Sequence, residues 1–67
     1  MDFIEKAKIR MSHWIEHNRQ HIQEYKNFAE ELRKVGKTKS AQCIEEMVKY
    51  IEKSNKSLEN ALNALEE

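Results

Sequence analysis

The sequence is poor in the residues that interrupt or cross-link a fold. Its 67 residues include no proline, one glycine and one cysteine. Because proline and glycine most often interrupt regular structure, their scarcity predicts long uninterrupted elements. A single cysteine excludes a disulfide within the chain. The chain has neither a bilayer-spanning apolar run nor, in its first ten residues, the hydrophobic region of a signal peptide. We therefore expect a reduced, cytoplasmic protein with no membrane partner.

The chain also lacks an excess of charge of either sign. Twelve Lys and Arg balance 12 Asp and Glu, so the formal net charge is zero. A protein that binds duplex nucleic acid normally has a basic surplus on one face, so we expect no nucleic-acid partner. The sequence contains no Gly-rich phosphate loop and no strand–turn–helix segment that could hold a nucleophile. We therefore expect a protein that is not an enzyme.

The residues that are abundant form the pattern of long helices. Charged residues make up 36% of the chain, and together with Ala and Leu they give a composition typical of helical bundles. Apolar residues recur at seven-residue intervals on both sides of a single turn signal. This pattern predicts one domain, 1–67, with a helix over about 2–35, a turn over about 36–39 and a helix over about 40–65.

The ends of the predicted helices have recognisable capping residues. Asp2 is placed to cap the first helix and Gly36 to end it, whereas Thr38 or Ser40 is placed to cap the second. A turn this short makes the two helices antiparallel neighbours. The predicted fold is therefore all-α, an antiparallel two-helix hairpin.

The heptad repeat predicts which side chains meet between the helices. With Ile4 at position a, the d positions of the first helix include Trp14, His21 and Phe28, and we expect the a and d positions to form the core. Folding about the turn then places His21 opposite Ser54 and Asn55. Both helices thus become polar at one level, which predicts a buried polar layer of Asn18, His21, Ser54 and Asn55.

The apolar arc of the second helix is wider than one partner helix needs. The simplest explanation is a homodimer in which two hairpins form a four-helix bundle. The residues expected at that interface are Trp14, Tyr25, Tyr50, Cys43, Leu62 and Ala64. An alternative is that a helix of another protein docks along Cys43, Tyr50 and Ala64.

All three histidines lie within nine residues, each four apart, so they share one side of a helix. Such spacing can hold a transition metal such as Zn, Ni or Cu, with His17 and His21 as the main ligands and His13 or Glu24 in support. Buried polar residues more often fix the packing of a bundle. We therefore prefer a self-associating, non-catalytic module with no cofactor, and we keep metal binding by the histidine run as the alternative.

Two segments resemble a family of short, functionally uncharacterised prokaryotic helical-hairpin domains. The first is HWIEHNRQH at 13–21, which fits the pattern HW-x-x-HN-x-x-H, and the second is NKSLENAL at 55–62, which fits N-x-x-L-x-x-A-L. The resemblance implies a stand-alone helical hairpin without an assigned activity. It also implies that the motif residues are His13, Trp14, His17, Asn18 and His21, with Asn55 as their partner on the second helix.

Overall fold

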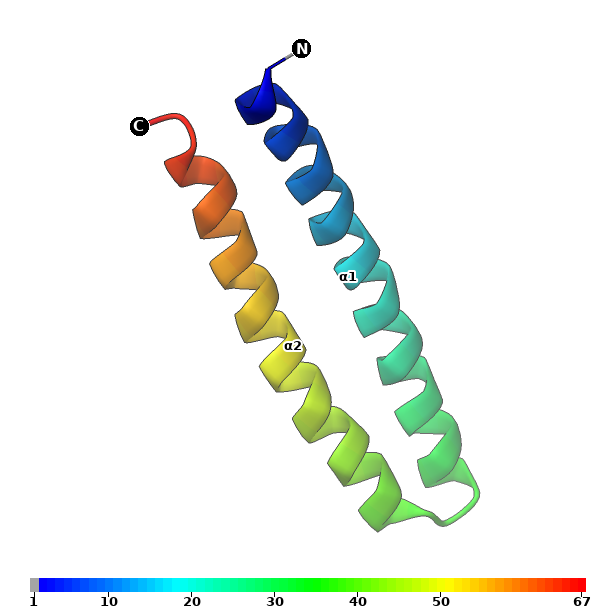
Figure 1. Cartoon of the computed structure of the whole chain (residues 1–67). Helices are drawn as coiled ribbons and strands as arrows, with labels where there is room; N and C mark the ends of the chain where they lie inside the picture. Colours follow the sequence, from blue (N-terminus) through cyan, green and yellow to red (C-terminus); the bar gives the residue numbers. More distant parts are fainter. Residues whose placement is uncertain (1) are drawn as a thin grey trace.

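The protein is a helical hairpin in the computed structural model, which describes residues 2–67 (Figure 1). Helix α1 spans Phe3–Lys34 and helix α2 spans Thr38–Ala64. The two helices run antiparallel and lie side by side, so both termini are at the same end (Figure 1). The described residues contain no strand. The all-α hairpin predicted from the heptad pattern is confirmed.

Backbone capping fixes the ends of α1. The Asp2 side chain accepts a hydrogen bond of 2.8 Å from the backbone N–H of Glu5, which satisfies one free donor of the first turn. At the other end, the N–H of Lys37 donates to the carbonyl of Leu32 at 2.8 Å and that of Gly36 donates to Arg33 at 3.0 Å. Gly36 has a φ of 83°, a conformation that glycine adopts without strain.

The start of α2 differs from the sequence prediction. The helix begins at Thr38, two residues earlier than expected, and its N-cap residue Lys37 provides no side-chain hydrogen bond. Ser40 therefore lies inside the first turn of α2, and neither Thr38 nor Ser40 is the cap. The reason is that the glycine-centred end of α1 reverses the chain within three residues.

The helices meet along a different set of positions from the predicted one. The buried residues recur every seven positions on each helix: Ile15, Ile22 and Ala29 on α1, and Ala41, Val48 and Asn55 on α2. In the predicted heptad these are e positions, and half-buried a positions such as Leu32 and Ile44 lie between them. The core is therefore an a/e seam, not an a/d seam.

This rotation leaves the large aromatic residues outside the core. Trp14 is 47% exposed and Phe28 is 52% exposed, although both were expected to be buried. Ala29 and Ala41, at 1% and 0% exposed, show why. Small side chains allow the two backbones to approach closely, whereas an indole or a phenyl ring at the same place would hold them apart.

The molecule is a thin rod. Its extents are 51 × 17 × 10 Å and its radius of gyration is 15.6 Å, compared with about 11 Å for a compact domain of this length. Two helices form a single layer, so each has one side in contact with the other and the remaining sides open. Within residues 2–67, neither helix has a segment long and apolar enough to cross a membrane.

Candidate functional site

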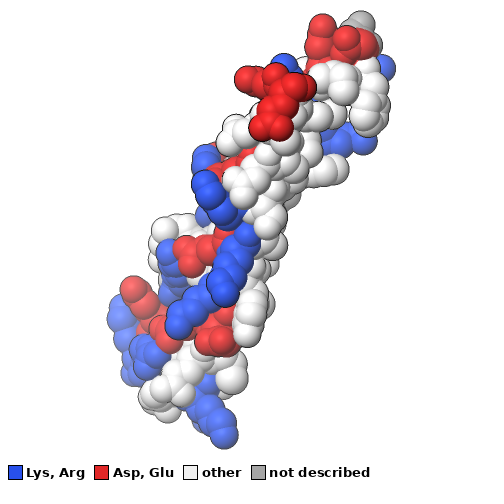
Figure 2. Space-filling view, turned by 90° about the vertical axis from the view of Figure 1, so that its left-hand side faces the viewer, with Lys and Arg blue, Asp and Glu red and all other residues white. Residues whose placement is uncertain are grey.

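One edge of the hairpin is a ladder of ion pairs between the helices. Three basic residues of α1, spaced seven apart, pair with three glutamates of α2 that are also spaced seven apart. We call these three pairs the charge ladder; they are Arg19–Glu59, Lys26–Glu52 and Arg33–Glu45. The Arg19 and Lys26 pairs have N···O distances of 2.7 and 3.3 Å. Charged side chains of both signs alternate along one side of the surface in Figure 2, whereas the other side is largely uncharged.

The charge ladder also shifts the ionisation of Arg33 and Glu45, the pair joined by two hydrogen bonds. Hydrogen bonding to the Arg33 guanidinium lowers the pKa of Glu45, and the same bond raises the pKa of Arg33. The glutamates at 45, 52 and 59 thus pair across the hairpin, and Glu59 also pairs with Lys56 of its own helix at 3.7 Å. The equal seven-residue spacing of the basic and acidic residues is the sequence signal that would have identified the ladder.

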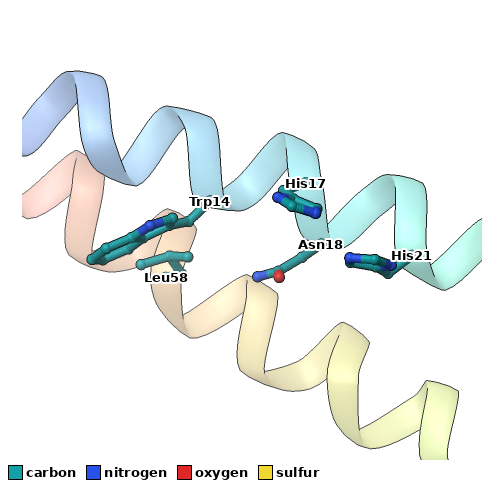
Figure 3. A pocket seen from close by; sticks show the side chains of 5 residues that line it. All are labelled: Trp14, His17, Asn18, His21 and Leu58. Carbon is teal, nitrogen blue, oxygen red and sulfur yellow. The ribbon is translucent and has the colours of Figure 1, made fainter.

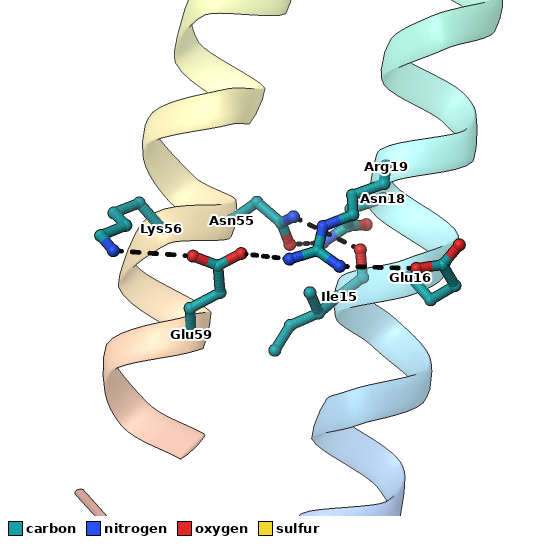
Figure 4. A network of polar contacts seen from close by, with 7 residues as sticks. All are labelled: Ile15, Glu16, Asn18, Arg19, Asn55, Lys56 and Glu59. Atoms are coloured by element: carbon teal, nitrogen blue, oxygen red, sulfur yellow. Dashed lines mark hydrogen bonds and ion pairs between the residues drawn. The ribbon is translucent and has the colours of Figure 1, made fainter. Parts of the chain in front are cut away.

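A pair of asparagines forms the polar centre of the seam (Figure 4). Asn55 is 5% exposed, and its side-chain oxygen accepts a hydrogen bond of 2.9 Å from the Asn18 amide. The Asn55 amide donates to the backbone carbonyl of Ile15 at 3.3 Å. The side chain is thus bonded through both its donor and its acceptor, which removes most of the cost of burying it.

Two of the four residues expected in this layer lie outside it. Ser54 is exposed, and its hydroxyl donates to the carbonyl of Ile51 in its own helix at 2.9 Å. His21 has a side chain that is 44% exposed, with Nδ1 at 3.4 Å from a carboxylate oxygen of Glu24. The a/e seam turns d positions such as His21 and Ser54 away from the core, so the layer consists of the two asparagines.

The histidines form a column of rings along α1. The rings of His17 and His21 stack with centroids 4.5 Å apart, and His21 stacks on Tyr25 at 5.9 Å. His13 meets His17 edge-on at 6.0 Å. Within residues 2–67, no group of three or more His, Cys, Asp or Glu side chains is arranged to hold a metal ion. The Zn, Ni or Cu site on His17 and His21 stays a prediction.

The edge opposite the charge ladder has no Lys, Arg, Asp or Glu at its central positions and lacks a partner helix in the described chain. We call it the open face and define it by the d positions of both helices: Ala7, Trp14, His21 and Phe28 on α1, and Met47, Ser54 and Ala61 on α2. A shallow hollow on this face is lined by Trp14, His17, Asn18 and His21 of α1 and by Leu58 of α2 (Figure 3). A second hollow beside it is lined by the apolar side chains of Phe3, Ala7, Met11, Trp14 and Leu65 and by the basic side chains of Lys6 and Arg10.

The other residues predicted at an interface divide between the two edges. Tyr50 is 63% exposed, and Cys43 and Ala64 are exposed at positions next to the open face. Tyr25 is half-buried beside His21. Leu62 is half-buried beside Ile15 and Arg19, on the side of the charge ladder. Leu62 therefore does not belong to the open face.

Comparison with known proteins places this hairpin in a family without assigning it a role. No curated protein and no solved structure matches the chain. A family described as a domain of unknown function, DUF8180, matches residues 7–65. The match covers the seam, the charge ladder and the open face, and it agrees with the uncharacterised small domain that the sequence motifs resemble. The chain therefore belongs to the DUF8180 family of domains of unknown function.

Proposed function

We propose that this hairpin is a non-catalytic module that self-associates through its open face into a homodimeric four-helix bundle. The observation that carries the proposal is the amount of surface the single chain exposes. Its accessible area is 5323 Å², whereas a folded monomer of 8.0 kDa exposes about 4,450 Å². The excess of about 900 Å² is close to the roughly 800 Å² that each partner buries in a standard interface.

The small size of the core supports the proposal that the chain has a permanent partner. The buried apolar residues of the described chain are Ile15, Ile22, Ala29, Ala41 and Val48, and none is larger than isoleucine. Domains of this size normally need a disulfide, a metal or oligomerisation to be stable. A second copy is available wherever the chain is made, which favours it over a partner met only occasionally.

The chemistry of the open face supports the same partner. Trp14 and Phe28 are about half exposed, and large aromatic side chains of this kind contribute most of the energy of protein interfaces. In a four-helix bundle each helix buries side chains against two neighbouring helices, so it needs an apolar stripe wider than a single seam. Packing two open faces together would give each helix a second buried stripe.

Sedimentation velocity over a concentration series tests the proposal. We expect a dimer of twice 8.0 kDa, and we expect the W14A/F28A variant to sediment as a monomer. The matched control is I9A, because Ile9 is 59% exposed but lies off the open face. Circular dichroism at 222 nm on the same samples records whether each variant keeps its helices.

Two results would overturn the proposal. The first is a wild-type monomer at roughly 100 µM, since interfaces of standard size have dissociation constants of micromolar or below. The second is a dimer that W14A/F28A and I9A weaken equally. Loss of the dimer in W14A/F28A alone supports the open face as the interface.

A further inference from the structure

We propose that the second copy binds with α1 against α1 and α2 against α2, each pair antiparallel, about a two-fold axis at the level of His21 and Ser54. This inference rests on the proposed self-association and adds the arrangement of the two copies. The observations that carry it are the order of charges beside the open face and the sizes of the side chains on it.

The charge order on α1 matches an antiparallel copy of itself. The row that borders the open face is Arg10, His17, Glu24 and Glu31, exposed and seven residues apart. Arg10 and Glu31 are equally far from the midpoint between residues 20 and 21, and so are His17 and Glu24. A two-fold axis there places Arg10 opposite Glu31 of the partner subunit and His17 opposite Glu24 of the partner subunit. Complementary charges of this kind fix orientation at interfaces.

Neither end of this charge row is satisfied within one chain. Arg10 and Glu31 form no ion pair among residues 2–67. By contrast, the basic residues of the charge ladder are all paired with α2. Arg10 and Glu31 thus lie beside the open face without an ion pair, where a partner would meet them.

The side chains of α2 fit the same axis. The Asn18–Asn55 hydrogen bond and the longer ion pairs of the charge ladder bracket the level of α2 against α1, and they place Ser54 within about one helical turn of His21. A two-fold axis at that level places Met47 opposite the partner's Ala61 and Cys43 opposite the partner's Ala64. On α1, Trp14 meets the partner's Phe28. Large side chains facing small ones, together with an aromatic pair, allow the dense packing of a bundle core.

Two open faces can also pack about a two-fold axis of another direction, but the charges of the two copies are then less complementary. A two-fold axis parallel to the helices would pack α1 against the α2 of the second copy at the same level. Arg10 would then face the partner's Ala64, and Glu31 would face the partner's Cys43. Both charges would border neutral side chains, so the charge order of α1 would have no counterpart.

Cross-linking through the native cysteine distinguishes the two arrangements. In the proposed one, an A64C variant forms a disulfide between position 64 and Cys43 of the partner subunit, and an E31C variant does not. In the other arrangement, E31C forms the cross-link and A64C does not. Positions 43 and 64 of one chain are about 30 Å apart along α2, too far for an internal disulfide. The readout is the dimer band on a non-reducing gel after mild oxidation.

Charge reversal gives an independent test. We expect R10E and E31R each to raise the dimer dissociation constant on the order of tenfold, and R10E/E31R to restore it. A dimer band from A64C with rescue in the double variant supports the arrangement. A dimer that cross-links through E31C, or through neither position, overturns the arrangement and leaves self-association in place. A wild-type monomer in sedimentation refutes self-association itself.

Discussion

Replacing Asn55 with alanine tests whether the asparagine pair stabilises the hairpin. Asn55 is 5% exposed and makes two hydrogen bonds across the seam, one with the Asn18 side chain and one with the carbonyl of Ile15. The N55A change removes both bonds and leaves the Asn18 amide facing an apolar side chain. An unpaired polar group inside a protein is costly because it has also lost its water.

The expected cost is large for so small a chain. Two hydrogen bonds contribute about 0.5–1.5 kcal/mol each, and the unpaired amide adds to this, so we expect a loss of about 2–3 kcal/mol. The whole chain has a free energy of unfolding of roughly 3–10 kcal/mol. The melting temperature should therefore fall by about 10–20 °C at fixed protein concentration.

Urea denaturation followed by circular dichroism at 222 nm measures the effect. The matched control is N60A, because Asn60 is exposed on the same helix and the change in helix propensity is identical. The double variant N18L/N55L replaces both partners with apolar side chains, and we expect it to be as stable as the wild type or more so. Equal stability of N55A and N60A would refute the reasoning, as would a double variant as unstable as N55A.

Other predictions concern the ladder, the turn and the histidines. Hydrogen bonding to Arg33 lowers the pKa of Glu45. The stability that this pair contributes is therefore present above the ordinary carboxyl pKa and is lost as the pH falls through the lowered pKa of Glu45. In an acid titration followed by circular dichroism, E45Q should lose less stability than the wild type. G36A should cost about 1–2 kcal/mol in urea denaturation, because alanine is strained at positive φ, although nothing lies within 4 Å of the added Cβ; an unchanged midpoint would contradict this. In calorimetric titration with Zn²⁺ above neutral pH we expect weak, unsaturable heats, and tight binding abolished by H17A would instead establish a metal site.

The local features of the fold were predictable from the sequence because they depend on neighbouring residues. Asp2 caps α1 through the backbone of Glu5, and Gly36 ends the helix with a positive φ. These interactions join residues two to five positions apart, so a linear pattern contains them. The level at which Asn55 meets α1 also followed from the short turn, because antiparallel pairing fixes it within about one turn of helix.

The candidate site was harder to predict because it depends on how far each helix is rotated about its axis. Positions d and e both border position a, so the heptad pattern of α1 is compatible with a seam on either side. The d side placed Trp14 and Phe28 in the core, whereas both are about half exposed, and the e residues Ile15, Ile22 and Val48 are buried instead.

The sequence by itself determined two long helices, their antiparallel order and the glycine that ends the first, since each follows from propensity, periodicity and capping within a few residues. Only the tertiary structure decided that the seam runs through Ala29 and Ala41, where small side chains let the backbones approach. That choice places the charge ladder on one edge and the aromatic residues on the open face. Its physical basis is the packing of side chains far apart in the sequence, which no local pattern records.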